Sequence, residues 1–499
     1  MVAAFALSAP LTATASTWVV DNCNGDDDSS GNIGAKTGTL RFTIKNAADG
    51  DTIDVSQIGC PQSKISLTTG EIFVSQPSLT ILGPGISGLT IDGTGLPGGP
   101  TGPDNSRPFT HTGTGTFELD SLRVSGGHVY HASYGYPSRG GCVYSKGKVY
   151  LLDAEVSNCS AESFGDAAKG GGVYALDNVT MKYSTLSGNT ALGATTAHGG
   201  GAFTTAGFGA KYSAVDGNKV NGPNGPGTAS TDYKYATGGG VYAKGSVEFK
   251  RSTISDNYAS GSFGGIHALG TLVSAANNTL SLYSSTISGN QAGKFNGGVY
   301  TNAGTVKLYN STIAFNTAGI GHVGSSPIYF IGPGLALSGA LTAMNVTLQS
   351  SLLSNNTYGS SAEFDLTTSN STNQDTFFHT ITFNGDSADP ANNLIRTSIV
   401  QDSAHKLPAG TQFSVCPLLG PLRDNGGLTL THALQSKSPA IDAGNNILNY
   451  NEDQRQTGAD TIPYPYPRVS NGQADIGAYE VNQDDIIYNS GFEGCSIVI

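Results

Sequence analysis

Two polar stretches of the chain hold the residues best suited to bind a ligand. Each combines tyrosines with basic side chains: His131, Tyr134, Tyr136 and Arg139 in the first, and Tyr233, Lys234 and Tyr235 in the second. Exposed aromatic residues on the loops of a rigid scaffold are typical of binding sites. The two stretches therefore predict binding of a sugar or a surface component. Packing within the loops themselves is the simpler alternative.

Catalysis on a polysaccharide would require carboxylates that lie close together. Glycoside hydrolases use paired acids, and lyases hold Ca²⁺ with carboxylates beside a base. When the repeats described below are aligned, each of these acids stands alone in its column: Asp153, Glu155, Asp216, Glu248 and Asp256. Other acids fall on loops: Asp166, Asp232, Glu363 and Asp365. The pattern favours a non-enzymatic protein, with a polysaccharide lyase or glycoside hydrolase as the alternative.

Charged residues also cluster near each end of the chain. Asp26, Asp27 and Asp28 offer oxygen ligands for Ca²⁺, but no bidentate Glu closes the segment as in an EF-hand loop. A solvated turn is the favoured interpretation, and no metal site or other cofactor is predicted. A second group is expected to form ion pairs that lock a C-terminal cap: Asp442, Asp453, Arg455, Asp475 and Glu480.

The cysteines and the N-terminal segment indicate export. Six cysteines occur without a Cys-x-x-Cys pair, which disfavours zinc. Many pairings are possible, and sequence order favours three disulfides: Cys23–Cys60, Cys142–Cys159 and Cys416–Cys495. Residues 1–15 are small and apolar and end in Ala-Thr-Ala, which fits a signal peptide remnant cleaved before Ser16. Since no later segment approaches the roughly 18 apolar residues of a membrane span, we expect a secreted or bacterial cell-surface protein.

The elements that position these residues are set by a repeat in the middle of the chain. One pattern is Gly-Gly-aliphatic-aromatic, as in 171–174 and 239–242, and the other is Ser-Thr-Ile-Ser-Gly-Asn or a variant, as in 184–189 and 252–257. Copies of the second pattern follow one another after 26 to 40 residues. Two apolar columns precede it, two residues apart, which predicts the buried face of a strand. Its Asn is expected to adopt a left-handed turn and to bond to the copies above and below.

Such a unit cannot bury its apolar face alone, whereas stacked copies about 4.8 Å apart form a continuous core. The repeat therefore predicts an all-β fold, a right-handed parallel β-helix, the handedness following from the usual hand of strand crossovers. Stacking would align two outer rows: Lys182, Lys211 and Lys250, followed by Tyr283 and Tyr309, and the aromatic row of Tyr144, Tyr174, Phe203, Tyr242, His267 and Tyr300. Either row could bind a sugar or a surface, and an aromatic ladder that only stabilises the stack is the alternative.

The chain divides into five segments by composition. They are a signal peptide remnant at 1–15, an N-terminal cap with the first coils at 16–125, the repeats at 126–400, a C-terminal capping module at 401–480 and a tail at 481–499. Leu40, Ile44, Ala47 and Ala48 recur at helical spacing, which predicts a short capping helix. Caps at both ends would prevent edge-to-edge association of the solenoid.

Several motifs resemble a known family. Ser-Pro-Ala-Ile-Asp-Ala-Gly at 438–444, Asp-Gln-Arg at 453–455 and Asp-Ile-Gly-Ala-Tyr-Glu at 475–480 resemble the C-terminal module of exported bacterial β-helix proteins of the choice-of-anchor Q family. Segments 40–45 and 50–53 resemble the N-terminal part of the same proteins. The alternating repeats are similar to those of polymorphic outer-membrane proteins, which are adhesins. The resemblance implies an exported β-helix protein and no particular reaction.

Composition narrows the classes of partner. Only 12% of the residues are charged and the net charge is -12, which repels phosphate, so no nucleic-acid partner is expected. The chain contains 37% hydrophobic residues, enough for a folded core. We therefore expect adhesion or glycan binding through an outer flank or loop edge, with a polysaccharide or a host or cell-surface component as the partner. A structural element of a surface layer or filament is a second alternative, and the oligomeric state stays open.

Overall fold

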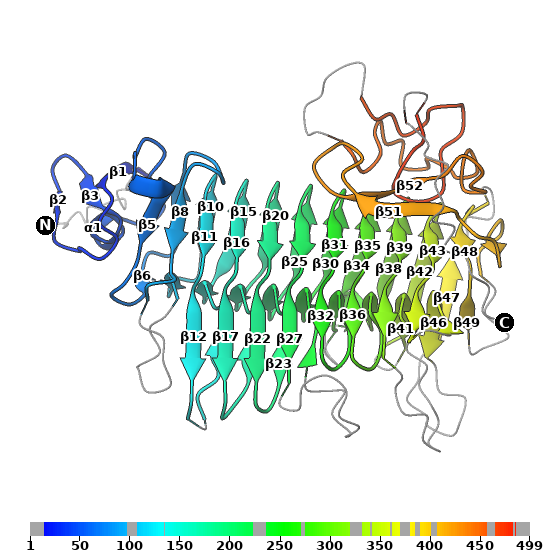
Figure 1. Ribbon diagram of the computed structural model, residues 1–499, viewed down its shortest axis with the longest axis horizontal. Helices are drawn as coiled ribbons and strands as arrows, with labels where there is room; N and C mark the ends of the chain where they lie inside the picture. Colours follow the sequence, from blue (N-terminus) through cyan, green and yellow to red (C-terminus); the bar gives the residue numbers. More distant parts are fainter. Residues whose placement is uncertain are drawn as a thin grey trace, which may run out of the picture.

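Stacked coils of short strands make up the molecule. The computed structural model describes residues 14–96, 107–133, 135–222, 236–270, 275–319, 332–339, 342–359, 362–369, 380–384, 390–400, 407–456, 465–482 and 485. Within these residues the coils follow one axis, and strands of successive coils pair in parallel (Figure 1). The all-β parallel β-helix expected from the repeat is confirmed.

One coil shows how the repeat is built. Strands β14 (Val143–Ser145), β15 (Lys148–Leu152) and β16 (Glu155–Ser157) enclose the core. The chain then leaves the core in β17 (Ser160–Ser163) and returns in β18 (Ala168–Lys169). The next coil begins with β19 (Val173–Ala175), and each strand pairs in register with its counterpart one coil earlier.

Stacking converts the five strand positions into five sheets. In the described part of the chain, sheet A has 14 strands between β2 (Gly31–Asn32) and β47 (Ile381–Asn384), sheet B has 12 between β5 (Lys64–Ser66) and β50 (Gln412–Phe413), and sheet C has 11 between β6 (Ile72–Val74) and β49 (Ser398–Val400). Sheet D has nine, between β12 (His128–His131) and β45 (Ala362–Glu363). Sheet E has four: β13 (Ser138–Arg139), β18, β23 (Ala197–His198) and β28 (Ala236–Thr237).

The core lies between sheets A, B and C. Val149, Leu151 and Val156 point inward from one coil and are at most 1% exposed, as the two apolar columns and the anchor position of the repeat predict. Burial of each such side chain contributes about 1.5–3 kcal/mol. Because the coils repeat these positions, the buried residues from Trp18 to Ile395 form one hydrophobic cluster.

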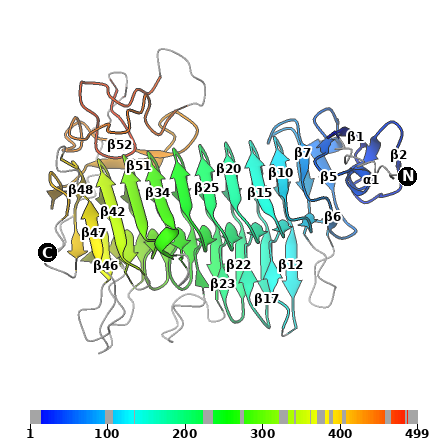
Figure 2. The same cartoon turned by 180° about the vertical axis from the view of Figure 1, so that it is seen from behind.

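Sheets D and E form a thin fin beside the core. Its interior contains a cluster of small aliphatic residues: Ala168, Ala191, Ala197, Val220, Ala236 and Ala259. Their small side chains let the two sheets approach closely. Figure 2 shows β12, β17, β22 (Thr190–Gly193) and β23 on the side of the molecule opposite the C-terminal segment. Tyr136, from the first tyrosine-rich stretch, lies on the fin in the loop between β12 and β13.

The two sequence patterns of the repeat meet inside the coil. Each Asn of the second pattern donates from its backbone N and its Nδ2 to the Oδ1 of the next: Asn189, Asn218, Asn257, Asn290, Asn316 and Asn356. We call this row the asparagine ladder. The second glycine of the Gly-Gly pattern packs against it, since a Cβ on Gly172, Gly201 or Gly240 would lie 2.9 to 3.1 Å from the amide carbon of its Asn.

The prediction that these asparagines adopt the left-handed conformation is wrong, because the residue before each of them adopts it. The positive φ belongs to the preceding residue, as at Gly188 (+63°), Gly217 (+62°) and Asp256 (+53°). That residue makes the bend, and the Asn that follows is free to point inward, where it is fully buried. A positive φ also occurs at the glycine before the Gly-Gly pair, for example at Gly170 (+66°).

A short helix covers the N-terminal end, as predicted. Helix α1 (Leu40–Asn46) begins after Thr39, whose side chain accepts from the backbone N of Phe42. Leu40, Phe42 and Ile44 are buried, and Trp18 of β1 (Thr17–Asn22) joins the same cluster. The helix is shorter than expected because it ends at Asn46, so Ala47 and Ala48 lie beyond it.

The C-terminal module differs from its expected position. We predicted that residues 401–480 cap the open end of the solenoid, but β51 (Leu419–Arg423) and β52 (Thr431–Leu434) lie along its side (Figure 1). The Nε of Arg251 donates to the carbonyl of Asp453 at 3.1 Å, and the backbone N of Gly477 donates to the carbonyl of Ser350 at 2.8 Å. The module therefore spans several coils, because the turns between sheets A and B offer hydrogen-bonding groups and apolar side chains.

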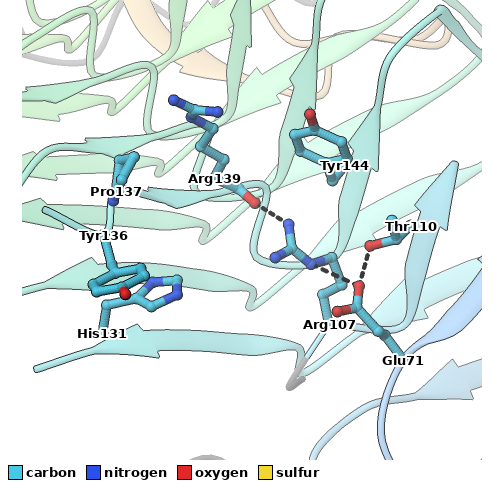
Figure 3. A pocket seen from close by; sticks show the side chains of 8 residues that line it. All are labelled: Glu71, Arg107, Thr110, His131, Tyr136, Pro137, Arg139 and Tyr144. Carbon is cyan, nitrogen blue, oxygen red and sulfur yellow. Dashed lines mark hydrogen bonds and ion pairs between the residues drawn. The ribbon is translucent and has the colours of Figure 1, made fainter. Parts of the chain in front are cut away.

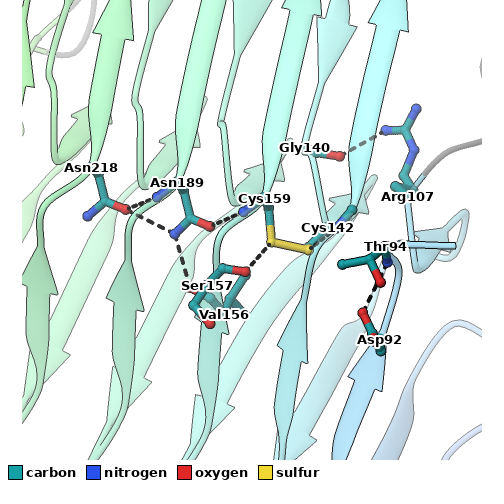
Figure 4. The surroundings of a disulfide bond; sticks show 11 residues. Asp92, Thr94, Arg107, Gly140, Cys142, Val156, Ser157, Cys159, Asn189 and Asn218 are labelled. Carbon is teal, nitrogen blue, oxygen red and sulfur yellow. Dashed lines mark hydrogen bonds between the residues drawn. A yellow bond between two sulfur atoms is a disulfide. The ribbon is translucent and has the colours of Figure 1, made fainter. Parts of the chain in front are cut away.

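Two disulfides follow the sequence order. Cys23 pairs with Cys60, and Cys142 pairs with Cys159. The second bond stands at the start of the asparagine ladder, where the backbone N of Cys159 donates to the Oδ1 of Asn189 at 3.0 Å (Figure 4). Cys495 lies outside the described residues, so the pair Cys416–Cys495 stays a prediction.

Candidate functional site

A pocket opens between the fin and the outer face of sheet C, at the N-terminal end of both (Figure 3). It has a volume of about 280 Å³ and is lined by Glu71, Arg107, Thr110, His131, Tyr136, Pro137, Arg139 and Tyr144. On the sheet side, Thr110 lies in β9 (Phe109–His111) and Tyr144 in β14, while Glu71 and Arg107 stand just before β6 and β9. On the fin side, the lining comes from β12, β13 and the loop between them. Three of these residues, His131, Tyr136 and Arg139, come from the first tyrosine-rich stretch.

Arg107 is fixed at the base of the pocket by four groups. Its Nε lies 3.1 Å from Oε2 of Glu71, and its Nη1 donates to the carbonyls of Arg139 and Gly140. The guanidinium carbon lies 5.4 Å from the ring centre of Tyr144. Thr110 donates its hydroxyl to the same carboxylate of Glu71. The charges of Glu71 and Arg107 therefore neutralise each other inside the pocket (Figure 3).

The fin side of the pocket presents an aromatic surface. The ring of Tyr136 is 57% exposed and stacks on the buried ring of His131, with 6.2 Å between ring centres and 15° between planes. His131 is held by Ser138, whose hydroxyl lies 2.7 Å from its Nδ1, and Ser163 of the next coil donates to the carbonyl of Tyr136 at 3.1 Å. The loop is thus anchored from two coils, and Tyr136 stays exposed at its tip.

The aromatic row predicted from the Gly-Gly pattern forms a stacked ladder on sheet C. Tyr144, Tyr174, Phe203 and Tyr242 follow at 5.0 to 5.4 Å between ring centres. All but Tyr144 are at most 7% exposed. The alternative that the row stabilises the stack is therefore favoured over a free aromatic strip.

Basic residues cover this ladder at regular steps. The residue before each glycine run lies over the aromatic ring of the following coil: Arg139 at 5.5 Å from the Tyr174 centroid, Lys169 at 5.4 Å from Phe203, and His198 at 4.6 Å from Tyr242. Arg139, Lys169 and His198 are in register on sheet E. Lys244 reaches back to Phe203, 6.0 Å from its ring centre. We call Arg139, Lys169 and Lys244 the basic row.

The lysine row expected on sheet A is present but partly covered. Lys182, Lys211 and Lys250 are in register. Lys182 lies 4.9 Å from the ring centre of Tyr183, Lys211 4.8 Å from that of Tyr212, and Lys250 5.2 Å from that of Tyr450 in the C-terminal module. Tyr134, Tyr233, Lys234 and Tyr235 lie outside the described residues.

Two carboxylates approach each other at the end of sheet A strands, Asp120 in the coil before the aligned repeats and Asp153 in the first aligned coil. The hydroxyl oxygen of Ser121 lies 2.8 Å from Oδ1 of Asp120 and 3.4 Å from Oδ2 of Asp153, so the two acids are near each other. Burial and then the charge of Asp120 raise the pKa of Glu118. Among the described residues, no group of three or more His, Cys, Asp or Glu side chains is arranged to hold a metal ion.

The loop acids near the far end of the fin have structural partners. Asp365 is buried at the end of the asparagine ladder, where its Oδ1 accepts from Asn356 and its Oδ2 from Thr397. Burial, followed by the charge of Glu363, raises the pKa of Asp365 to about 7. Glu363 pairs with Arg396 at 2.8 Å.

The five charged residues predicted to lock the C-terminal module do lie together. Arg455 is fully buried, with its Nε 2.9 Å from Oδ2 of Asp453, which also accepts from the backbone N of Glu480. Asp475 accepts from the backbone N of Asp442, and its own backbone N donates to Glu480 at 2.8 Å. Burial raises the pKa of Asp475 to about 6 and that of Glu480 to about 8.

The acidic run near the N-terminus is engaged by the protein itself. Asp26 accepts from the backbone N of Thr68 at 2.7 Å, and Asp27 from that of Ser29 at 2.8 Å. Asp28 lies 3.0 Å from the Nζ of Lys45. The three carboxylates thus face different partners.

Sequence analysis missed part of the site. Glu71, Arg107 and Thr110 belong to coils that precede the aligned repeats, so no column contained them. Lys169 and His198 did carry a signal, because each stands directly before a run of glycines in the same position as Arg139. Alignment on the glycine run would have placed all three in one column.

Comparisons with known proteins add the following. No protein-family model and no curated protein matches the chain. Among solved structures, the crystal structure of pectate lyase Pel9A is similar, with 13% sequence identity and a TM-score of 0.39 over 94% of this chain and 97% of that one. Within the described residues, no helix has the length and apolar character needed to cross a bilayer.

Proposed function

We propose that this protein is an exported binding protein that holds a saccharide in the pocket beside Tyr136. The observation that carries the proposal is the exposed ring of Tyr136, anchored by His131 and Ser163 beside the pocket of about 280 Å³. A sugar ring can stack on such an aromatic face while its hydroxyl groups bond to nearby polar side chains. The two described disulfides fit an oxidising compartment outside the cytosol.

The proposal extends to adhesion, since a pocket at one end of a rigid solenoid can be presented to a partner surface. A bound polysaccharide on another cell or in the surrounding matrix would then act as the partner. The choice-of-anchor Q and polymorphic outer-membrane protein resemblance agrees with this use, and it stays a proposal here.

A glycan array with matched variants tests the proposal. Tyr136→Ala should reduce binding at least tenfold, because it removes the stacking face. Phe164→Ala is the control, since Phe164 is an equally exposed aromatic residue, 58% against 57%, and does not line the pocket. Equal binding by both variants and the parent chain would contradict the assignment of the site.

Polysaccharide cleavage remains the second candidate, favoured by the acids Asp120 and Asp153, which both lie within 3.4 Å of the Ser121 hydroxyl oxygen. Paired acids are the usual machinery of hydrolysis. The pocket beside Tyr136 is a poorer place for that chemistry, because Glu71 is the one acid lining it and is paired with Arg107. Release of reducing ends from a panel of polysaccharides, lost in Asp120→Asn, would favour an enzyme.

A further inference from the structure

Charge is unevenly distributed over this acidic molecule. The chain carries a net charge of -12, yet the basic row gathers three cations over the aromatic ladder of sheet C. In the part of the chain that the structure describes, no carboxylate pairs with Arg139 or Lys244. Glu71 forms an ion pair with Arg107. The negative charge of Asp166 raises the pKa of Lys169, against the larger opposing effect of burial.

Contacts with the aromatic rings explain some of the basic residues in the row, but not all of them. A cation over an aromatic face is favourable, which explains one basic residue for each ring. Phe203 has two, Lys169 at 5.4 Å and Lys244 at 6.0 Å. Burial and then the charges of Lys244 and Arg139 lower the pKa of Lys169, so these cations repel one another. An anionic ligand beside these cations would relieve that repulsion.

The geometry of the row selects an extended ligand. Arg139 and Lys169 stand on adjacent, in-register strands of sheet E, which are about 4.8 Å apart. A polysaccharide with acidic sugars likewise carries its charges in a regular series along one extended chain. The next position, His198, is uncharged at neutral pH because burial, followed by Lys169 and Lys244, lowers its pKa to about 3. Of the three in-register positions on sheet E, Arg139 and Lys169 therefore carry the charge.

We propose that the basic row binds a strand of acidic polysaccharide that extends from the pocket along the coils. The anionic groups are uronate carboxylates or sulfate esters, which present the same charge to the row. This inference rests on the proposed function, because it names the substrate class of the same site. It adds that recognition continues beyond the Tyr136 pocket over the next coils.

Binding of polygalacturonate, dextran sulfate and uncharged dextran to the full chain tests the inference. Either acidic polymer should bind, dextran should not, and raised salt should weaken binding. The double variant Lys169→Gln/Lys244→Gln should lose at least tenfold in affinity. The matched control Lys148→Gln/Lys219→Gln changes the net charge equally at two exposed lysines outside the row and should stay within twofold.

The outcomes separate the two proposals. An equal loss in both double variants would overturn the basic row as the site, as would binding of duplex DNA with the same affinity. If a neutral glycan binds in a Tyr136-dependent way while both acidic polymers fail, the inference is wrong and the proposed function stands. If none of the saccharides binds, both fail.

Discussion

Removing one amide from the middle of the asparagine ladder should open the coils on either side of it. Asn257 is fully buried, and its Nδ2 donates to the carbonyl of Val215 and to Asn290, both at 2.9 Å. Its Oδ1 accepts from the backbone N and the Nδ2 of Asn218, at 3.0 and 2.9 Å. Asn257→Ala therefore removes four buried hydrogen bonds.

The size of the effect follows from those four bonds. Each contributes about 1 kcal/mol, and the partners left behind are buried without replacement, so a loss of about 4 kcal/mol in local stability is expected. A difference of about 1.4 kcal/mol corresponds to a factor of ten, so local opening should become about a thousandfold more frequent.

Hydrogen exchange of backbone amides measures this local opening directly, and it does not require the whole solenoid to unfold in one step. Amides of 214–221 and 253–259 should exchange about a thousandfold faster in Asn257→Ala. Thr180→Ala, at an exposed position of sheet A, is the control and should change stability by less than about 0.5 kcal/mol. Similar exchange in the two variants would refute the view that the ladder holds the coils in register.

His432 and Glu480 should give the stability of the C-terminal module two pH dependences of opposite sign. Burial lowers the pKa of His432 to about 4 from its ordinary value of about 6.5. The unfolded chain therefore takes up the proton first, and stability falls as pH drops through that window. In thermal unfolding experiments, His432→Gln should show a shallower loss of stability with falling pH. Burial raises the pKa of Glu480 to about 8, so the folded module holds a proton that the unfolded chain releases. Stability should therefore fall as pH rises from about 4 to 8. Glu480→Gln should flatten that slope in the same assay, and an unchanged slope would contradict the prediction. Replacing Cys142 and Cys159 by Ala opens a loop of 17 residues and should cost about 3 kcal/mol, measured by chemical denaturation; a loss under about 1 kcal/mol would show that the bond adds little.

The repeat was predictable because its physics is local and periodic. Val149 and Leu151 stand two residues apart in every copy, so their burial in a strand follows from sequence, and stacking follows from the need to cover them. The reason for the Gly-Gly pattern could not be predicted from the sequence. Gly240 packs against the side chain of Asn257, 17 residues later in the chain, and that contact leaves little room for a Cβ.

The site and the C-terminal module were harder to predict, for different reasons. Tyr136 was identified from its loop, but Arg107 and Glu71 join it from coils that lack the repeat pattern. The module attaches through pairs such as Arg251 and Asp453, which are 202 residues apart, and no periodicity marks such a contact. Its charged motifs do indicate an internally locked unit, and they say nothing about which face of the solenoid the unit covers.

The most direct test of the central claim is a structure of the protein with an acidic oligosaccharide bound. We expect one sugar to stack on Tyr136 and the following sugars to place their anionic groups beside Arg139, Lys169 and Lys244. An oligosaccharide found instead along Lys182 and Lys211 on sheet A, or beside Asp120 and Asp153, would contradict the account.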